Sequence, residues 1–128
     1  MALEANGDWS KFFGLIEKYS EMVFEIHEDY YKKISKMKGS TNPLYFCEGG
    51  AWTSVGYDEP VGKIYEASTA SLGYIGINEM LNAMNVGENE RQERAIEVVR
   101  YLKKLVENAT IKYNHLYALY STPKLCGR

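Results

Sequence analysis

Seven acidic or histidine side chains are the candidates for acid–base chemistry in this chain of 128 residues. They are His27, Glu28, Asp29, Glu48, Asp58, Glu59 and His115. General acid–base catalysis needs such groups to converge in a pocket, and these show no recognisable nucleophile–base spacing. We expect His27 to be solvated beside its acidic neighbours and His115 to be a packed or surface residue. The sequence therefore does not favour an independent small enzyme.

The two cysteines, Cys47 and Cys126, form neither a CxxC pair nor a cysteine–histidine cluster. Two histidines with scattered acidic residues do not make a recognisable metal site, so we expect no metal and no cofactor. The thiols fit the reduced state of a cytosol. Apolar runs are only a few residues long, and residues 1–8 lack a cationic segment followed by an apolar one, which predicts a soluble, unexported protein without a membrane partner.

The charge balance excludes binding that depends on a strong overall charge. Fifteen Lys and Arg against 17 Asp and Glu give a formal net charge of -2. Such a chain has no global electrostatic reason to bind nucleic acid or an anionic membrane. With 45% hydrophobic residues it can instead bury one sizeable core.

Residues 8–38 predict one long helix whose apolar stripe is a core face, because apolar residues recur at spacings of three and four. The stripe consists of Phe12, Ile16, Tyr19, Val23, Ile26, Tyr30, Ile34 and Met37. Asp8 can cap the helix and Gly39 is expected to end it. Lysines near residues 32–38 suit the negative end of the helix dipole. The alternative is a phosphate-binding patch beside Tyr30 and Tyr31, which the charge balance disfavours.

The following segment is predicted to be an irregular crossing with little regular structure. Residues 40–43 indicate a turn, residues 44–47 a short extended stretch, and the chain is then polar and irregular to Pro60. Loops of this length are uncommon in compact domains and are often functional. Trp52 and Tyr57 either fold back onto the core or anchor a partner.

The second half of the chain predicts a strand, two helices and a final strand. Residues 67–76 are small and punctuated by glycine, which indicates a strand and a tight turn, and residues 77–84 have helical spacing. Residues 88–112 repeat the helical period, with Ile96, Val99, Leu102, Val106 and Ala109 as the apolar face. Residues 115–120 alternate like a strand. We therefore expect a single α/β domain over residues 1–128, with a right-handed parallel crossover if both strands share a sheet.

Three stretches, residues 3–8, 68–79 and 119–123, together resemble the catalytic subunit of the anaerobic (class III) ribonucleotide reductase. The resemblance covers essentially the whole chain, and its middle motif contains Gly73-Tyr74-Ile75-Gly76. It implies that the chain is similar to an internal segment, a slice of the family's ten-stranded α/β barrel. This slice is expected to be a single truncated domain.

The same resemblance implies that the family's radical machinery lies outside this region. The thiyl-radical cysteine precedes the matched segment, and the glycyl-radical loop and four-cysteine zinc site follow it, so neither Cys47 nor Cys126 inherits these roles. Gly73 and Gly76 are interpreted as turn glycines rather than radical carriers. We therefore expect no radical chemistry and no enzyme activity from this chain alone.

The end of the chain departs from the family pattern. The reductases usually continue from Ser-Thr-Pro through Ala-Glu-Ser-Leu into a helix that suits a phosphate. Here Ser121-Thr122-Pro123 runs into Lys124-Leu125-Cys126-Gly127-Arg128. Ser121, Thr122 and Lys124 are left either as a vestigial anion contact or as part of a frayed terminus.

Such a slice exposes strand edges and apolar faces, which predicts a binding function. The first hypothesis is a repurposed, non-catalytic fragment that binds a protein or ribonucleoprotein complex in the cytoplasm of a bacterial host. A phage-encoded inhibitor of a host defence complex, of the anti-CRISPR type, is its specific form, and a homodimer is a further alternative. The expected interface residues are Tyr30, Tyr31, Trp52 and Tyr57. The second hypothesis is a piece of a split or truncated reductase.

Overall fold

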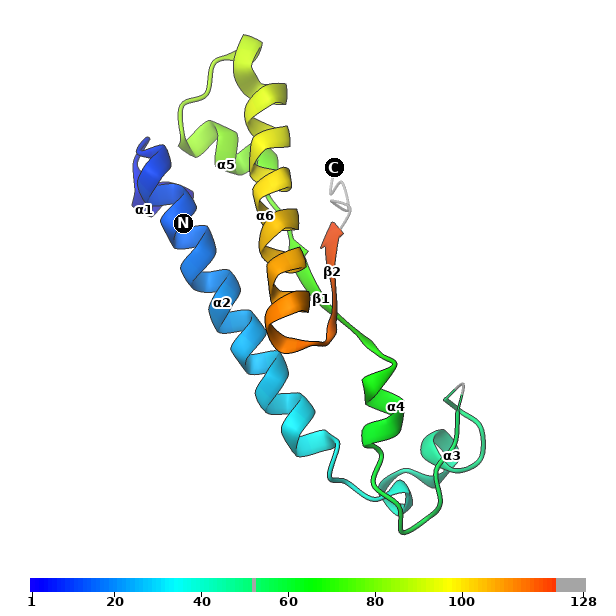
Figure 1. Cartoon of the computed structure of the whole chain (residues 1–128). Coiled ribbons are helices and arrows are strands. Elements are labelled where there is room, and N and C mark those ends of the chain that lie inside the picture. Colours follow the sequence, from blue (N-terminus) through cyan, green and yellow to red (C-terminus); the bar gives the residue numbers. More distant parts are fainter. Residues whose placement is uncertain (52, 122–128) are drawn as a thin grey trace.

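The computed structural model shows an elongated α/β molecule and describes residues 1–51 and 53–121 (Figure 1). The elements are α1 (Ala2–Ala5), α2 (Trp9–Ile34), η1 (Gly39–Thr41), α3 (Pro43–Phe46), α4 (Gly62–Glu66), β1 (Thr69–Tyr74), α5 (Ile77–Ala83), η2 (Glu88–Glu90), α6 (Arg91–Tyr113) and β2 (Leu116–Ser121). The predicted α/β class is confirmed. Within the described part of the chain, no helix is both long and apolar enough to cross a membrane.

The long first helix forms as predicted but ends earlier. The Asp8 side chain accepts a hydrogen bond of 3.0 Å from the backbone N–H of Lys11 and so caps the first turn. The helix ends at Ile34 rather than near residue 38. Lys38 instead pairs with Pro60 in an antiparallel bridge, and Gly39 begins the short helix η1. A contact distant in sequence, rather than a glycine stop, therefore terminates the helix.

The two strands form one parallel sheet, as predicted. The register runs from Thr69 opposite Leu116 to Tyr74 opposite Ser121, and α5 and α6 make the connection between the strands. Gly76, with φ of 86°, makes the turn between β1 and α5 because this left-handed conformation suits a residue without Cβ. Gly73 is not a turn glycine, since it lies within β1.

The main core lies between the sheet and the two long helices. In Figure 1, α6 lies between α2 and β2; α2 packs on α6 and β1, and α6 packs on β2. Leu72 from β1 and Tyr117 from β2 are buried against the helices. The buried face of α6 is made of Val98, Leu102, Val106 and Ala109. The predicted face was therefore wrong at Ile96, which is exposed, and missed Val98.

The buried row of α2 differs from the predicted stripe. Its buried residues are Phe12, Ile16, Ser20, Phe24 and Glu28, one in every four. Of the predicted stripe, Phe12 and Ile16 are buried, Val23 and Ile34 are half-buried, and Tyr19, Ile26, Tyr30 and Met37 are exposed. The difference arises because α6 and two strands are too narrow to cover the whole apolar face of a 26-residue helix.

Hydrogen bonds from three aromatic or basic residues tie α2 to α6. Glu21 accepts hydrogen bonds from the Lys112 ammonium and, at 2.7 Å, from the Tyr113 hydroxyl. The hydrogen bond from Lys112, followed by that from Tyr113, lowers the pKa of Glu21. One helical turn or more away, the Tyr101 hydroxyl donates to Glu17 at 3.3 Å. These contacts align the two helices along their length.

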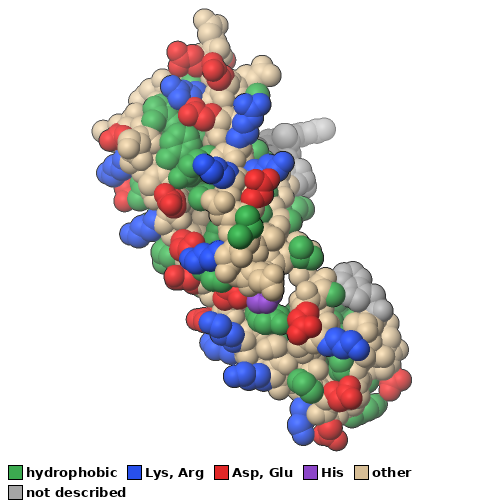
Figure 2. Space-filling model, viewed as in Figure 1, with side chains coloured by type: hydrophobic (Ala, Val, Ile, Leu, Met, Phe, Trp, Pro, Cys, Tyr) green, Lys and Arg blue, Asp and Glu red, His purple; other side chains and the backbone are tan. Residues whose placement is uncertain are grey.

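A smaller unit follows the end of α2 and has its own core, made of Phe46, Ala51, Val55, Val61 and Ile64. Figure 2 shows it as the smaller lobe at the lower right. The prediction of an extended stretch at residues 44–47 is wrong, because the helix α3 begins at Pro43. The fixed φ of proline suits the first position of a helix. The helix α4 was also not predicted. Burial of Phe46 and Ile64 in a shared cluster stabilises these short helices.

Candidate functional site

Of the seven acid–base candidates, the structure brings only Glu28 and His115 into direct contact. Glu48 and Asp58 instead bind Tyr57 and Lys38 within the smaller unit. Of the others, His27 lines one cavity together with Glu28 and His115, where it packs edge-on to the ring of Tyr117. Glu59 accepts from the backbone N–H of Gly56, and Asp29 faces Lys32 on the surface of α2. Among residues 1–51 and 53–121, no group of three metal-ligating side chains is assembled.

Glu28 is the centre of a buried polar network that joins α2 to β2. Its Oε1 lies 2.8 Å from Nδ1 of His115 and accepts a hydrogen bond of 2.7 Å from the Tyr117 hydroxyl. Glu28 and Tyr117 are both buried, and the ring of Tyr31 packs on the His115 ring at 4.1 Å between centroids. A buried carboxylate is costly unless it has hydrogen-bond partners, and His115 and Tyr117 both supply them at Oε1.

The electrostatics of this network point to a structural role. Burial, followed by the hydrogen bond to Glu28, raises the pKa of the Tyr117 hydroxyl, so the hydroxyl stays protonated and donates at neutral pH. The network also lies at the N-terminal ends of both strands, whereas ligands of parallel α/β sheets bind beyond the C-terminal ends. The sequence identified Glu28 and His115 as candidates but did not identify Tyr117. That residue was predicted only as part of the strand at residues 115–120.

Of the four aromatic residues expected at an interface, the structure describes three, and it places Tyr30 and Tyr31 at one cavity on α2 and Tyr57 on the smaller unit. Tyr30 is exposed on α2, whereas Tyr31 is half-buried against His115. Tyr57 is exposed on the smaller unit, where its hydroxyl donates to Glu48 at 3.0 Å. Trp52 lies outside the described residues. The predicted anchors Tyr30 and Tyr57 therefore lie on different parts of the molecule.

The expected anion contact involves the end of β2. Ser121 is the last residue of that strand and is exposed. Thr122 and Lys124 lie outside the described residues. The contact stays a prediction.

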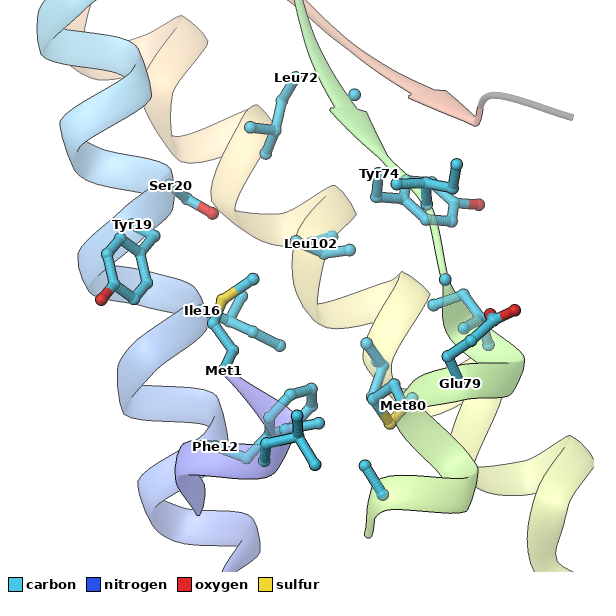
Figure 3. Close-up of a pocket in the computed structure, with 18 of the residues that line it drawn as sticks. Met1, Phe12, Ile16, Tyr19, Ser20, Leu72, Tyr74, Glu79, Met80 and Leu102 are labelled. Atoms are coloured by element: carbon cyan, nitrogen blue, oxygen red, sulfur yellow. The ribbon is translucent and has the colours of Figure 1, made fainter. Parts of the chain in front are cut away.

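Two cavities lie between α2 and β1. The first, of about 620 Å³, is apolar and is shown in Figure 3. Ile16 and Phe12 of α2, Leu72 of β1, Met80 of α5 and Leu102 of α6 surround it. Cavities of this size and apolar character are typical of binding sites.

The second cavity, of about 550 Å³, continues along the same strand. It is lined by Ile26, Tyr30 and Ile34 of α2, by residues 69–71 of β1 and by the residues of the Glu28 network. Sequence reasoning did not identify either cavity. The signal was nevertheless present, because the exposed members of the apolar stripe on α2 line them.

Comparison with known proteins identifies relatives over the full chain. The family model described as anaerobic ribonucleoside-triphosphate reductase matches residues 1–128. The reductase of this name from Escherichia coli is 31% identical over 137 residues, covering 100% of this chain and 19% of the relative. That of Haemophilus influenzae is 33% identical over 105 residues, which cover 75% of this chain and 15% of the relative.

A viral relative shares the same segment. The anaerobic ribonucleoside-triphosphate reductase of Enterobacteria phage T4 is 29% identical over 122 residues, covering 92% of this chain and 19% of the phage protein. No solved structure matches the chain significantly. The chain spans less than a fifth of the length of these relatives. Its full-length family match nonetheless confirms the resemblance read from the sequence, and the chain belongs to the anaerobic ribonucleoside-triphosphate reductase family.

Proposed function

We propose that this chain is a non-catalytic part of an anaerobic ribonucleoside-triphosphate reductase and works by binding polypeptide that supplies the rest of the enzyme. The observation that carries this proposal is the family match over residues 1–128 in a chain equal to 19% of the Escherichia coli reductase. Exposed apolar residues on α2 support it, because large apolar patches favour a protein partner.

The side chains of the described residues support a non-catalytic role. Cys47 is the cysteine in this part of the chain, and burial, followed by the charge of Glu48, raises the pKa of its thiol. Reactive cysteines instead have a lowered pKa, because the thiolate is the reactive form. The Glu28 network is engaged in joining α2 to β2. Neither group has the environment of a catalytic centre.

The test is reassembly with the missing parts of a reductase. The two portions of the Escherichia coli enzyme that flank the 137 matched residues would be co-expressed with this chain, and the complex analysed by size-exclusion chromatography with light scattering. The matched Escherichia coli segment serves as the positive control. We expect this chain to co-elute with the flanking portions. Assembly of the control segment but not of this chain would contradict the proposal.

A second candidate function is inhibition of a bacterial defence complex, of the anti-CRISPR type, by a phage-encoded protein in the host cytoplasm. The relative in phage T4 favours this candidate, because it places the family in a virus. A tagged pull-down from a bacterial lysate, followed by mass spectrometry and a nucleic-acid assay, separates the two functions. Capture of a nucleic-acid-guided nuclease would favour inhibition, and capture of reductase subunits would favour the first proposal. Light scattering of the isolated chain tests the homodimer.

A further inference from the structure

The two cavities form successive parts of one groove along β1. Residues 68–71 line the cavity beside the Glu28 network, and residues 72–76 line the apolar cavity shown in Figure 3. Every residue of β1 therefore borders one cavity or the other. The opposite wall is α2, which runs the full length of both. We call this feature the β1 groove.

The apolar stripe of α2 supplies the wall of the β1 groove. Seven of its members line the two cavities: Phe12, Ile16, Tyr19, Val23, Ile26, Tyr30 and Ile34. Tyr19, Ile26 and Tyr30 are 40%, 54% and 63% exposed. A helical period of apolar residues marks a face that is normally buried. The apolar stripe runs along the whole of α2, but the rest of the described chain buries only part of it.

The backbone of β1 has an open edge beside this wall. Among the described residues, β1 pairs with β2, and no backbone hydrogen bond joins it to another element. In a parallel ladder each strand directs part of its N–H and C=O groups away from its partner. Figure 1 shows α2 on the side of β1 away from β2. The unpaired backbone groups and the apolar wall therefore border the same space.

The widths of the two layers explain why this space exists. Packed helices lie about 8–10 Å apart, whereas neighbouring strands are only about 4.8 Å apart. Two helices therefore cover more sheet than two strands provide. Because α6 packs on β2 and α2 lies on the far side of α6 from β2, α2 extends over positions where the described residues supply no strand. The two cavities, of about 620 and 550 Å³, lie in this space next to β1.

We propose that the β1 groove accepts an extended strand of the partner polypeptide, which pairs with β1 and buries alternate apolar side chains against α2. The identity of the partner as reductase polypeptide rests on the proposed function. An extended segment fits this site because one side offers peptide groups for hydrogen bonds and the other offers apolar side chains. Neither Lys nor Arg is among the described residues that line the two cavities, whereas Glu28 and Glu79 are. Acidic side chains on the added strand are therefore disfavoured, and the apolar members of the α2 wall favour apolar ones.

The probes are overlapping 15-residue peptides that span the Escherichia coli reductase. Binding to the purified chain would be measured by fluorescence anisotropy, and backbone protection by hydrogen–deuterium exchange with mass spectrometry. We expect the peptides that bind to have alternating apolar residues and to slow exchange in residues 69–74. Binding without slower exchange in β1, or the absence of any binding peptide, would overturn the inference.

Charge substitutions on α2 test the side-chain wall. Tyr19→Glu and Ile26→Glu place a carboxylate in the groove, and each should weaken peptide binding at least tenfold. Met22→Glu is the matched control, because Met22 is 47% exposed on the same helix but lines neither cavity. Its affinity should change less than twofold. Circular dichroism and exchange in α6 would verify folding, and equal losses in all three variants would overturn the inference.

The reassembly experiment separates this inference from the proposed function. Co-elution with the flanking reductase portions, without slower exchange in β1, would overturn strand addition and leave the proposed function supported. Peptide protection of β1, together with failure of reassembly, would support strand addition and contradict the proposed function. Loss of reassembly in Ile26→Glu but not in Met22→Glu would support both.

Discussion

Removal of the Tyr117 hydroxyl tests whether the Glu28 network joins α2 to β2. The substitution Tyr117→Phe keeps the ring, which is buried and packs edge-on to Phe24 at 5.1 Å between centroids. It removes the hydrogen bond of 2.7 Å to Glu28 and leaves that carboxylate with His115 alone. The packing is therefore unchanged while one buried carboxylate loses a donor.

The expected cost follows from the charge and burial of the acceptor. Hydrogen bonds to charged groups contribute about 1.5–3 kcal/mol, and both partners are less than 10% exposed, so we expect Tyr117→Phe to cost about 2 kcal/mol. An unfolding entropy of about 2.1 cal/mol/K per residue gives about 270 cal/mol/K for 128 residues. The midpoint of thermal unfolding should therefore fall by about 7 °C.

Urea and thermal denaturation followed by circular dichroism measure this change. Tyr120→Phe is the control, because Tyr120 lies on the same strand and is 56% exposed, and it should cost less than about 0.5 kcal/mol. In a Glu28→Leu background, Tyr117→Phe should lose most of its cost, as expected for a coupled pair. A cost equal to that of Tyr120→Phe, or one unaffected by Glu28→Leu, would refute the role of the network.

Three further substitutions test the packing, the smaller unit and the tie between the helices. Phe24→Ala empties a site that is 2% exposed and should lower the free energy of unfolding by about 3–5 kcal/mol in urea; a loss below about 2 kcal/mol would contradict the packing. Gly39→Ala places a Cβ 2.5 Å from the carbonyl oxygen of Gly56, so hydrogen exchange should accelerate in residues 35–66 but not in α6; unchanged exchange would contradict this close contact. The lowered pKa of Glu21 means that its stabilising effect is present above the ordinary value of about 4.3 and is lost as the pH falls below it. Between pH 6 and pH 3, Glu21→Gln should therefore lose less stability than the wild type, by under about 1 kcal/mol because the pair with Lys112 is partly exposed; equal losses would count against the tie.

Local sequence signals predicted the main elements because their causes are local. The Asp8 cap, the helical periods of residues 9–34 and 91–113 and the turn at Gly76 each depend on residues within a few positions. The end of α2 and the helices α3 and α4 were not predicted. They depend on the bridge between Lys38 and Pro60, which are 22 positions apart, and on a core shared by Phe46 and Ile64, which are 18 positions apart. Periodicity within one segment carries no information about such pairing.

The polar network shows the same division. Glu28 and His115 were named as candidates from their residue types, but they are separated by 87 positions in the chain. Only the tertiary structure brings them together, and it adds Tyr117 as the second donor. Its position at the N-terminal ends of the strands then favours a structural role over catalysis.

By itself, the sequence determined the family, the order of helices and strands, and the apolar stripe on α2. The tertiary structure decided which part of that stripe is covered: Phe12 and Ile16 are buried, while Ile26 and Tyr30 line an open groove. The physical reason is that apolar spacing records which side chains gain free energy on leaving water. Whether they are buried depends on the number of strands beneath the helix. The described part of the chain supplies two strands, whereas two packed helices can cover more than two.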